Sequence, residues 1–287
     1  MRKRQRLEDL NVLDDFMLNA IANDPDVGEV FFREVLSVLL ERDIGEVTVK
    51  AQSVSPGDTP ELRGIRLDVE IQEQDNSPAK CRLYNMEAQT YTGENLQKRS
   101  RYYQAKKDSK RLKRGEKNWD KLPDLYMIMI TTFDPFGKGG IIYTFENNCK
   151  EYPDVENKDG LKYIYFNTIG TKGGTESIKQ LLSYLKHSKI ENVTNEKISH
   201  IHDYVEAVKQ SAEVRDRYMT IGEMLDASKA EGEKIGRINS LLEILSEFGE
   251  IPEEIKKQFY EANEDTLKCW IKLAARSSSL VEFIDKM

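Results

Sequence analysis

The sequence contains little cysteine and little histidine. Its three cysteines, Cys81, Cys149 and Cys269, lie far apart and form no CxxC pair, so neither a zinc cluster nor a disulfide framework is indicated. His200 and His202 are two residues apart, a spacing that does not share one face of a helix, and this argues against a histidine metal site. No Ser, Cys or Thr has a nucleophile motif around it, so covalent catalysis has no support.

Long hydrophobic runs are also missing. No apolar stretch approaches the roughly 18 residues that a membrane span needs. The basic start of the chain leads into Leu7-Glu8-Asp9-Leu10, which is not the apolar core of a signal peptide. We therefore expect no membrane contact and a cytoplasmic location. A net charge of -7 excludes a surface coated in positive potential and leaves only local basic segments as candidates for nucleic-acid contact.

The patterning predicts an α/β protein. A length of 287 residues, 39% of them hydrophobic, favours one α/β domain over residues 1–175 and a helical C-terminal region over 176–287. Apolar residues at helical spacing from Asp14 to Glu41 predict two helices, which Asn23-Asp24-Pro25 divides. The apolar run from Leu125 to Thr132 indicates a central strand buried on both faces. Further strands are expected over 46–55, 65–72, 81–90, 141–145 and 163–166, with a helix over 95–112.

Two carboxylates fall on the polar faces of neighbouring predicted strands. Asp68 lies on the polar side of one strand, and Glu87 shares one face of the next with Asn85 and Gln89. If the hairpin turns near Asn76, Asp68 lies about opposite Asn85, and Glu87 becomes its diagonal neighbour, roughly 7–8 Å away between backbones. That separation lets both acids bind one divalent cation.

Clustered oxygen ligands of this kind suit the hydrolysis of a phosphodiester. A divalent metal neutralises the phosphate oxygens and makes hydroxide from water near neutral pH. Without a family context, Asp68 is better explained as an ordinary charge on the wet face of a half-exposed strand. A glycoside hydrolase also uses two acids, but it needs a raised acid pKa in a sugar-sized, aromatic-lined cleft and has no use for a basic segment.

Several segments resemble a known family in their order and spacing: Asp15-Phe16-Met17, Arg66-Leu67-Asp68-Val69, Tyr84 to Gln89, Arg99 to Tyr103, Tyr126 to Ile130, Asp134-Pro135-Phe136, Tyr143-Thr144-Phe145 and Gly232 to Gly236. The family is the recombination-promoting nuclease group, also labelled transposases, within the PD-(D/E)XK nuclease superfamily. The resemblance implies a restriction-endonuclease-like mixed β-sheet flanked by helices. It also implies a Mg²⁺-dependent DNA endonuclease, with Mn²⁺ as a substitute and DNA as the substrate.

The resemblance further implies roles for individual residues. Asp68 and Glu87 would bind Mg²⁺, and Gln89 would orient the attacking water where the superfamily has a lysine, matching the ExQ form of this group. A neutral amide can hydrogen-bond a water but supplies no positive charge. Asp15 would complete the metal shell, although it is as well explained as a helix cap or a dipole partner. The alternative to a nuclease is a DNA-binding or scaffolding protein that kept the fold and lost the chemistry.

A local excess of Lys and Arg follows the third predicted strand. Arg99, Arg101, Lys106 and Lys107 are candidates for contact with the DNA backbone, which would give salt-sensitive, largely non-specific binding. The alternatives are a solvated helix face, or support of the carboxylates by Arg99 and Arg101. In the tail, an apolar stripe from Ile238 to Phe248 indicates either packing within a small helical subdomain or association, as a homo-oligomer through the C-terminal helices or with another protein.

Overall fold

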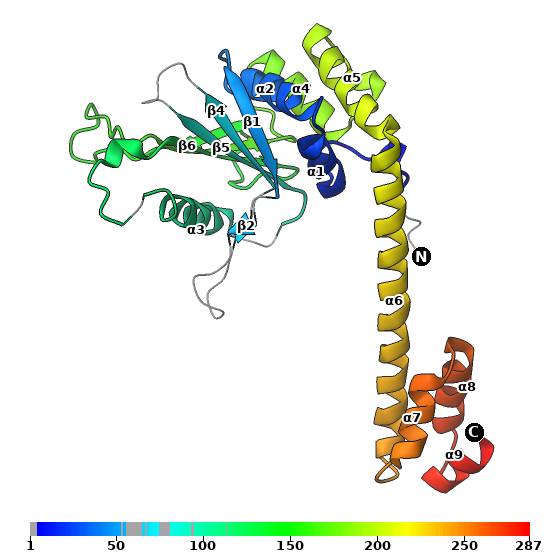
Figure 1. Ribbon diagram of the computed structural model, residues 1–287. Helices are drawn as coiled ribbons and strands as arrows, with labels where there is room; N and C mark the ends of the chain where they lie inside the picture. The colour runs from blue at the N-terminus through cyan, green and yellow to red at the C-terminus, as the bar shows by residue number, and fades with distance from the viewer. Residues whose placement is uncertain are drawn as a thin grey trace. The chain divides into compact units, whose positions relative to one another are not determined.

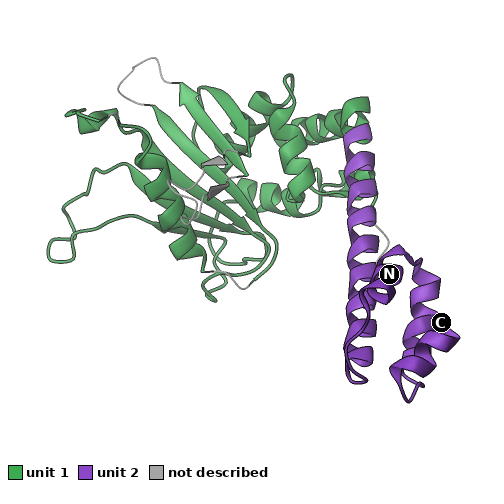
Figure 2. Cartoon of the chain, turned by 60° about the horizontal axis from the view of Figure 1, so that its bottom comes forward, with its two compact units in different colours: residues 1–215 green, residues 216–287 purple. Residues whose placement is uncertain are grey.

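The chain folds into two compact units, Met1–Arg215 and Asp216–Met287 (Figure 2). The computed structural model describes residues 5–52, 54–55, 65–66, 68–74, 81–92, 95–112 and 114–287. The first unit contains a six-stranded mixed sheet with helices on both of its faces (Figure 1), which confirms the expected fold class. Within the described residues, no helix is long and apolar enough to cross a membrane.

The strand order of the sheet is β1-β4-β5-β6-β8-β7. The pairs β5–β6 and β6–β8 are parallel, and the remaining pairs are antiparallel. The apolar run predicted as the central strand lies in β6, between β5 and β8, so that prediction is confirmed. The strands are β1 (Glu46–Ala51), β4 (Val69–Gln74), β5 (Arg82–Gln89), β6 (Asp124–Thr131), β7 (Ile142–Phe145) and β8 (Leu161–Asn167); β2 (Val54–Ser55) and β3 (Ile65–Arg66) form a separate two-stranded sheet.

The helices divide between the two units. The expected break between the first two helices is present. In this turn, Asp24 Oδ1 accepts the N–H groups of Asp26 and Val27, at 3.0 Å each. The first unit contains η1 (Leu7–Asp9), α1 (Asp15–Asn23), α2 (Gly28–Leu39), α3 (Leu96–Asp108), η2 (Trp119–Lys121), α4 (Glu176–Lys186), η3 (Ile190–Asn192) and α5 (Glu196–Gln210). The boundary between the units lies within α6 (Ala212–Ser246). The second unit also contains α7 (Glu253–Glu261), α8 (Glu264–Ala274) and α9 (Leu280–Lys286).

Side chains of β5 alternate between two covered faces of the sheet. Met86 and Ala88 pack among apolar residues of α1, α2 and α4. Leu83 points to the opposite face, where it packs against Tyr103 of α3. Figure 1 shows α3 on the side of the sheet away from α1 and α2. The sequence analysis expected this face of the sheet to be exposed to solvent. Because α3 covers it, polar side chains of β5 lie in the interior.

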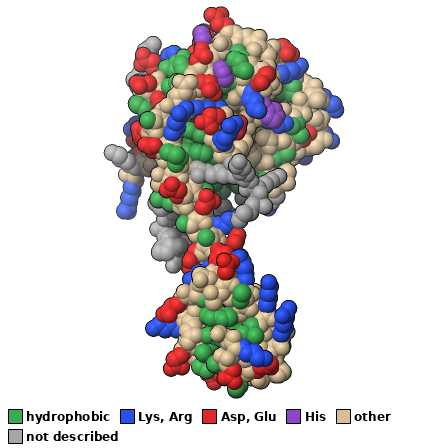
Figure 3. All heavy atoms as spheres, turned by 90° about the vertical axis from the view of Figure 1, so that its right-hand side faces the viewer, with side chains coloured by type: hydrophobic (Ala, Val, Ile, Leu, Met, Phe, Trp, Pro, Cys, Tyr) green, Lys and Arg blue, Asp and Glu red, His purple; other side chains and the backbone are tan. Residues whose placement is uncertain are grey.

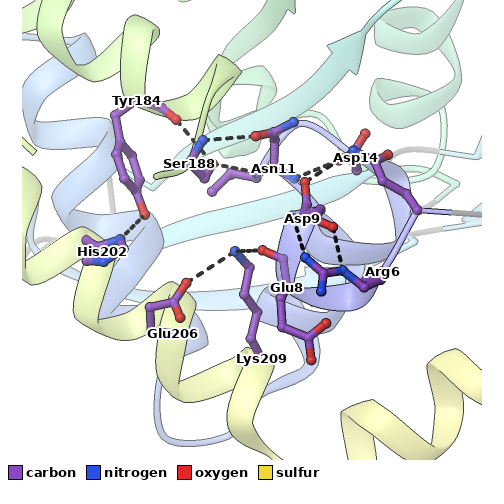
Figure 4. A network of polar contacts seen from close by, with 12 residues as sticks. Arg6, Glu8, Asp9, Asn11, Asp14, Tyr184, Ser188, His202, Glu206 and Lys209 are labelled. Carbon is purple, nitrogen blue, oxygen red and sulfur yellow. Dashed lines mark hydrogen bonds and ion pairs between the residues drawn. The ribbon is translucent and has the colours of Figure 1, made fainter. Parts of the chain in front are cut away.

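Polar contacts attach α4 and α5 to the N-terminal segment (Figure 4). The N–H of Ser188, just after α4, donates to Asn11 Oδ1 at 2.9 Å, and its Oγ accepts the N–H of Val12 at 2.9 Å. Lys209 of α5 donates to the carbonyl oxygen of Glu8 at 3.2 Å. These helices therefore pack within the first compact unit, which ends at Arg215, whereas the sequence prediction assigns residues 176–287 to a helical C-terminal region.

The second unit has its own hydrophobic core. Ile238, Leu241 and Leu245 of α6 are buried together with Phe259 and Phe283. Much of the apolar stripe predicted in the tail thus packs within its own unit, which is the first of the two alternatives expected for it. On the face of the molecule that Figure 3 draws, acidic and basic side chains are interspersed, in keeping with the absence of a uniformly positive surface.

Candidate active site

Asp68 and Glu87 lie side by side at the start of β4 and near the end of β5. Asp68 occupies the bend directly before β4, instead of the middle of a strand as the alternation suggested. Its backbone N–H donates to Glu87 Oε1 at 3.1 Å, and its own Oδ2 accepts the N–H of Ala88 at 3.0 Å. The two carboxylates are therefore fixed to each other's strands by hydrogen bonds.

The register of this hairpin differs from the one expected. The observed pairs are Val69 with Met86 and Glu70 with Asn85, so continuing the ladder by one residue sets Asp68 opposite Glu87. Asp68 does not lie opposite Asn85, and Glu87 is its direct partner and not its diagonal neighbour. Directly opposed residues have Cβ atoms only about 4.5–5.5 Å apart, which brings the two acids closer than the sequence argument required.

Burial shifts the pKa of the Glu87 carboxyl. Its side chain has 0% exposure beneath α3. This burial, followed by the neighbouring charge of Asp68, raises the pKa of Glu87 to about 8. Arg99 and the Asp68 N–H act in the opposite direction without cancelling the rise. A strongly shifted pKa with a named charge partner is typical of functional sites, although structural ion pairs shift pKa values as well.

Arg99 of α3 holds the second oxygen of Glu87. Its guanidinium donates to Glu87 Oε2 at 2.7 Å, and its Nε donates to the Tyr103 hydroxyl at 3.1 Å. The guanidinium also lies over the Tyr103 ring, 5.2 Å from its centroid. Arg99 thus reaches the carboxylates in the supporting manner that the sequence left open as an alternative to contact with DNA.

Gln89 lies two residues beyond Glu87 on the same buried face. Its Nε2 donates to the Ala88 carbonyl oxygen at 3.0 Å. Its Oε1 is buried and accepts no hydrogen bond from the described part of the chain. A buried acceptor without a donor is costly, on the order of 1–3 kcal/mol. The amide oxygen beside the carboxylates is therefore suited to a donor that the protein itself does not supply, such as a water molecule.

A family comparison fits this geometry. The model of the PD-(D/E)XK nuclease family transposases matches residues 26–230, well over half of the chain. The chain belongs to this family. Searches of curated proteins and of solved structures each find no match to it. Membership in the PD-(D/E)XK family supports a nuclease or transposase function and implies DNA as the substrate class.

Asp15 stands apart from the other acids proposed for a PD-(D/E)XK site. It precedes the matched residues 26–230 and is the exposed first residue of α1. No group of three or more His, Cys, Asp or Glu side chains suited to a metal occurs among the described residues, so Asp15 does not complete such a group with Asp68 and Glu87. Its place in the first turn agrees with the alternative of a dipole partner for the helix.

The basic residues of α3 point in different directions. Lys107 is 6% exposed and forms an ion pair with the buried Glu70 of β4, so it faces inward like Arg99. Lys106 is half-buried, whereas Arg101 is exposed. Two of the four residues expected to contact DNA therefore compensate acids on the sheet. The sequence contained a signal for this, because Arg99, Tyr103 and Lys107 follow one another at intervals of four residues and so share a helix face.

The residues present fit a divalent metal of the kind that PD-(D/E)XK nucleases typically use. Mg²⁺ commonly binds one or two protein carboxylates together with water and substrate phosphates, so a pair of acids suffices. Asp68 and Glu87 provide that pair, and Gln89 Oε1, which has no donor among the described residues, lies on the same face. Each carboxylate oxygen has two acceptor positions, so the hydrogen bonds already made to Glu87 leave capacity for a further partner.

Proposed function

We propose that the chain is a metal-dependent DNA endonuclease that hydrolyses phosphodiester bonds. Asp68 and Glu87 would hold Mg²⁺, or Mn²⁺ in its place, and Gln89 would position the attacking water. The observation that supports this most is the direct opposition of Asp68 and the buried Glu87 on adjacent strands of a PD-(D/E)XK family member. A bound divalent ion would neutralise phosphate oxygens and lower the pKa of a coordinated water.

The chain's own residues would prepare the water and the ligands. Gln89 Oε1 would accept a hydrogen bond from the water and fix its orientation, filling the acceptor that the described residues leave without a donor. A lysine at this position would add positive charge, and Gln89 adds none. Arg99 contacts the site directly, because its guanidinium donates to Glu87 Oε2. It would orient Glu87 and share it with the metal.

Two further roles belong to the same proposal. Arg101 and Lys106 would contact the DNA backbone from α3, while Arg99 and Lys107 serve the interior. Self-association would use the first half of α6, where Met224 and Leu225 are 65% and 64% exposed. Contiguous exposed apolar patches mark interaction surfaces, and Met219 and Ile221 on the same helix are exposed as well.

The test is plasmid nicking by the full chain in the presence of Mg²⁺. Asp68→Asn and Glu87→Gln should each abolish conversion of supercoiled plasmid to open circles, because each replaces a proposed carboxylate ligand with an amide of nearly the same size. Asp15→Asn tests the proposed third acid, and Asp26→Asn, an exposed acid between α1 and α2, is the control. Equal nicking by all these variants would indicate a contaminating nuclease and remove the assignment.

The second candidate is a DNA-binding protein that retained the fold and lost the chemistry. Two observations favour it: an amide stands at position 89, and Arg99 already occupies Glu87 Oε2. Calorimetry separates the two candidates. Mg²⁺ or Mn²⁺ binding that disappears in Asp68→Asn supports the nuclease, whereas retention of DNA without any metal binding supports the binding protein.

A further inference from the structure

A second concave surface lies on the other flank of α3, facing β7 and β8. We call it the α3–β8 groove. It has a volume of about 490 Å³ and is lined by Lys98 and Arg101 of α3, by Phe145 at the end of β7, and by Tyr163 and Tyr165 of β8. A volume of this size suits one small organic group, since ligand pockets span roughly 300–1,000 Å³. None of these residues belongs to the proposed metal site.

The groove is positive in a chain whose net charge is negative. Among the described residues, its lining includes two cations and no acid, although the chain has 50 acids against 43 Lys and Arg residues. Burial raises the pKa of Tyr163, and the charge of Arg101, which lines the groove with Tyr163, opposes that rise. Asp108 and Asp159 also act on Tyr163, but neither lines the groove. An anion entering here would meet Lys98 and Arg101.

One wall of the groove is an aromatic surface held in a fixed position. Phe145 is 44% exposed, yet its ring contacts Phe136 at a centroid distance of 5.0 Å and Tyr165 edge to face at 5.8 Å. Phe136 in turn meets Tyr165 edge to face at 5.1 Å. The Tyr165 hydroxyl lies 3.2 Å from Ser100 Oγ of α3. Part of the Phe145 ring thus stays exposed in the groove while its neighbours hold the ring in place.

An aromatic ring beside two cations fits a nucleobase and its phosphate. Aromatic side chains stack on bases irrespective of sequence, and cations follow the phosphate backbone. In a duplex the faces of each base are covered by its neighbours, so only an unstacked base can reach the ring.

The α3 helix forms a wall of both the groove and the carboxylate site. The two sites are therefore separated by about the diameter of one helix, which is about 10–12 Å with side chains.

We propose that the α3–β8 groove binds an unstacked nucleotide of single-stranded DNA, stacking its base on Phe145 and pairing its phosphate with Lys98 and Arg101. The inference rests on the proposed function for the identity of the strand as DNA. It adds a binding subsite that makes the protein prefer single-stranded or opened DNA over an intact duplex. The strand would pass over α3 from the groove toward Asp68 and Glu87.

The experiment is fluorescence anisotropy of the full chain with a labelled oligothymidine and with a duplex of equal length, in EDTA so that no cleavage occurs. Phe145→Ala should weaken single-strand binding about 10-fold, as expected for one stacked base, and change duplex binding less than about 2-fold. Arg101→Gln should weaken single-strand binding and make its dependence on salt shallower. Tyr260→Ala in the second unit and Lys197→Ala on α5 are matched controls that should change neither.

A second variant keeps the test independent of folding. Phe145→Trp should retain single-strand affinity, and its added indole fluorescence should be quenched by oligothymidine but not by the duplex. Unchanged single-strand affinity in Phe145→Ala, equal losses for both DNA forms, or no quenching in Phe145→Trp would each overturn the groove assignment. Because these measurements need no metal, they are separate from the nicking assay, whose failure would overturn the proposed endonuclease alone.

Discussion

Burial disfavours the charged form of Glu87, and the resulting loss of folding stability at high pH should be measurable without DNA. Burial and the charge of Asp68 raise the pKa of Glu87 from its ordinary value of 4.5 to about 8. Between these values the folded protein holds a proton that the unfolded chain has released. Stability should therefore fall as pH rises from about 4.5 to 8 and level off above that. Each pH unit in the window costs about 1.4 kcal/mol, so the full effect is on the order of 3–5 kcal/mol.

The perturbation that isolates this cost is Glu87→Gln, which preserves size and cannot ionise. Near pH 5 the variant should be about as stable as the natural protein. By pH 9 it should be more stable by several kcal/mol, because the natural protein then bears a buried charge. The assay is hydrogen exchange across a urea series, read on peptides of β5 and β6 and corrected for intrinsic exchange rates. Local peptides are needed because the two units need not unfold together.

Glu73 on β4 is the matched control of opposite sign. Burial would raise the pKa of Glu73, but hydrogen bonds from Arg42, Tyr84 and the Gly45 N–H outweigh it and lower the pKa to about 2. Its stabilising contribution is thus present above pH 4.5 and is lost as the pH falls toward 2. Glu73→Gln should destabilise the protein at pH 7 by up to about 3 kcal/mol and have little effect near pH 2. A Glu87→Gln variant that loses stability at pH 9, as Glu73→Gln does at pH 7, would refute the reasoning.

Two predictions concern the C-terminal unit. Phe259→Ala should destabilise α7 to α9 by about 3–5 kcal/mol, since Phe259 is fully buried against Trp270 and Phe283, and should leave exchange in the β-sheet unchanged; parallel loss of protection in β5 would contradict the division into two units. Leu225→Glu should convert a self-associated chain into a monomer in sedimentation velocity, because a charge would enter the proposed interface. An equal sedimentation coefficient in both proteins would remove α6 as that interface.

The sequence predicted the elements of the sheet better than their register. Alternation and the apolar run of β6 identified the strands, because side-chain periodicity is a local property. The register depends on where the hairpin turns, and the observed pairs place its midpoint one residue later than the sequence suggested. Such a shift moves each partner by two residues. Asp68 therefore changed partner from Asn85 to Glu87, while every side chain kept its face.

The environment of the candidate site was harder to predict, because it depends on a helix that is mostly polar. The stripe of α3 that faces the sheet contains Arg99 and Lys107, so it lacks the apolar periodicity by which a core-facing helix is recognised. Its partners are acids on two different strands, Glu87 and Glu70. Charge compensation of this kind joins residues distant in sequence, and a strand pattern alone shows those acids only as a polar face.

The same arrangement limits how the protein can bind DNA. A basic segment that follows the strand of Glu87 suggests a strong electrostatic surface, but Arg99 and Lys107 contact the buried Glu87 and Glu70 and cannot both turn to phosphates without giving up these contacts. Breaking a buried ion pair costs on the order of 3–5 kcal/mol, more than a phosphate contact at the surface returns. Arg99 and Lys107 would therefore add little to the affinity for DNA. Base stacking in the proposed α3–β8 groove would supply binding energy that does not depend on charge, which suits a chain with net charge -7.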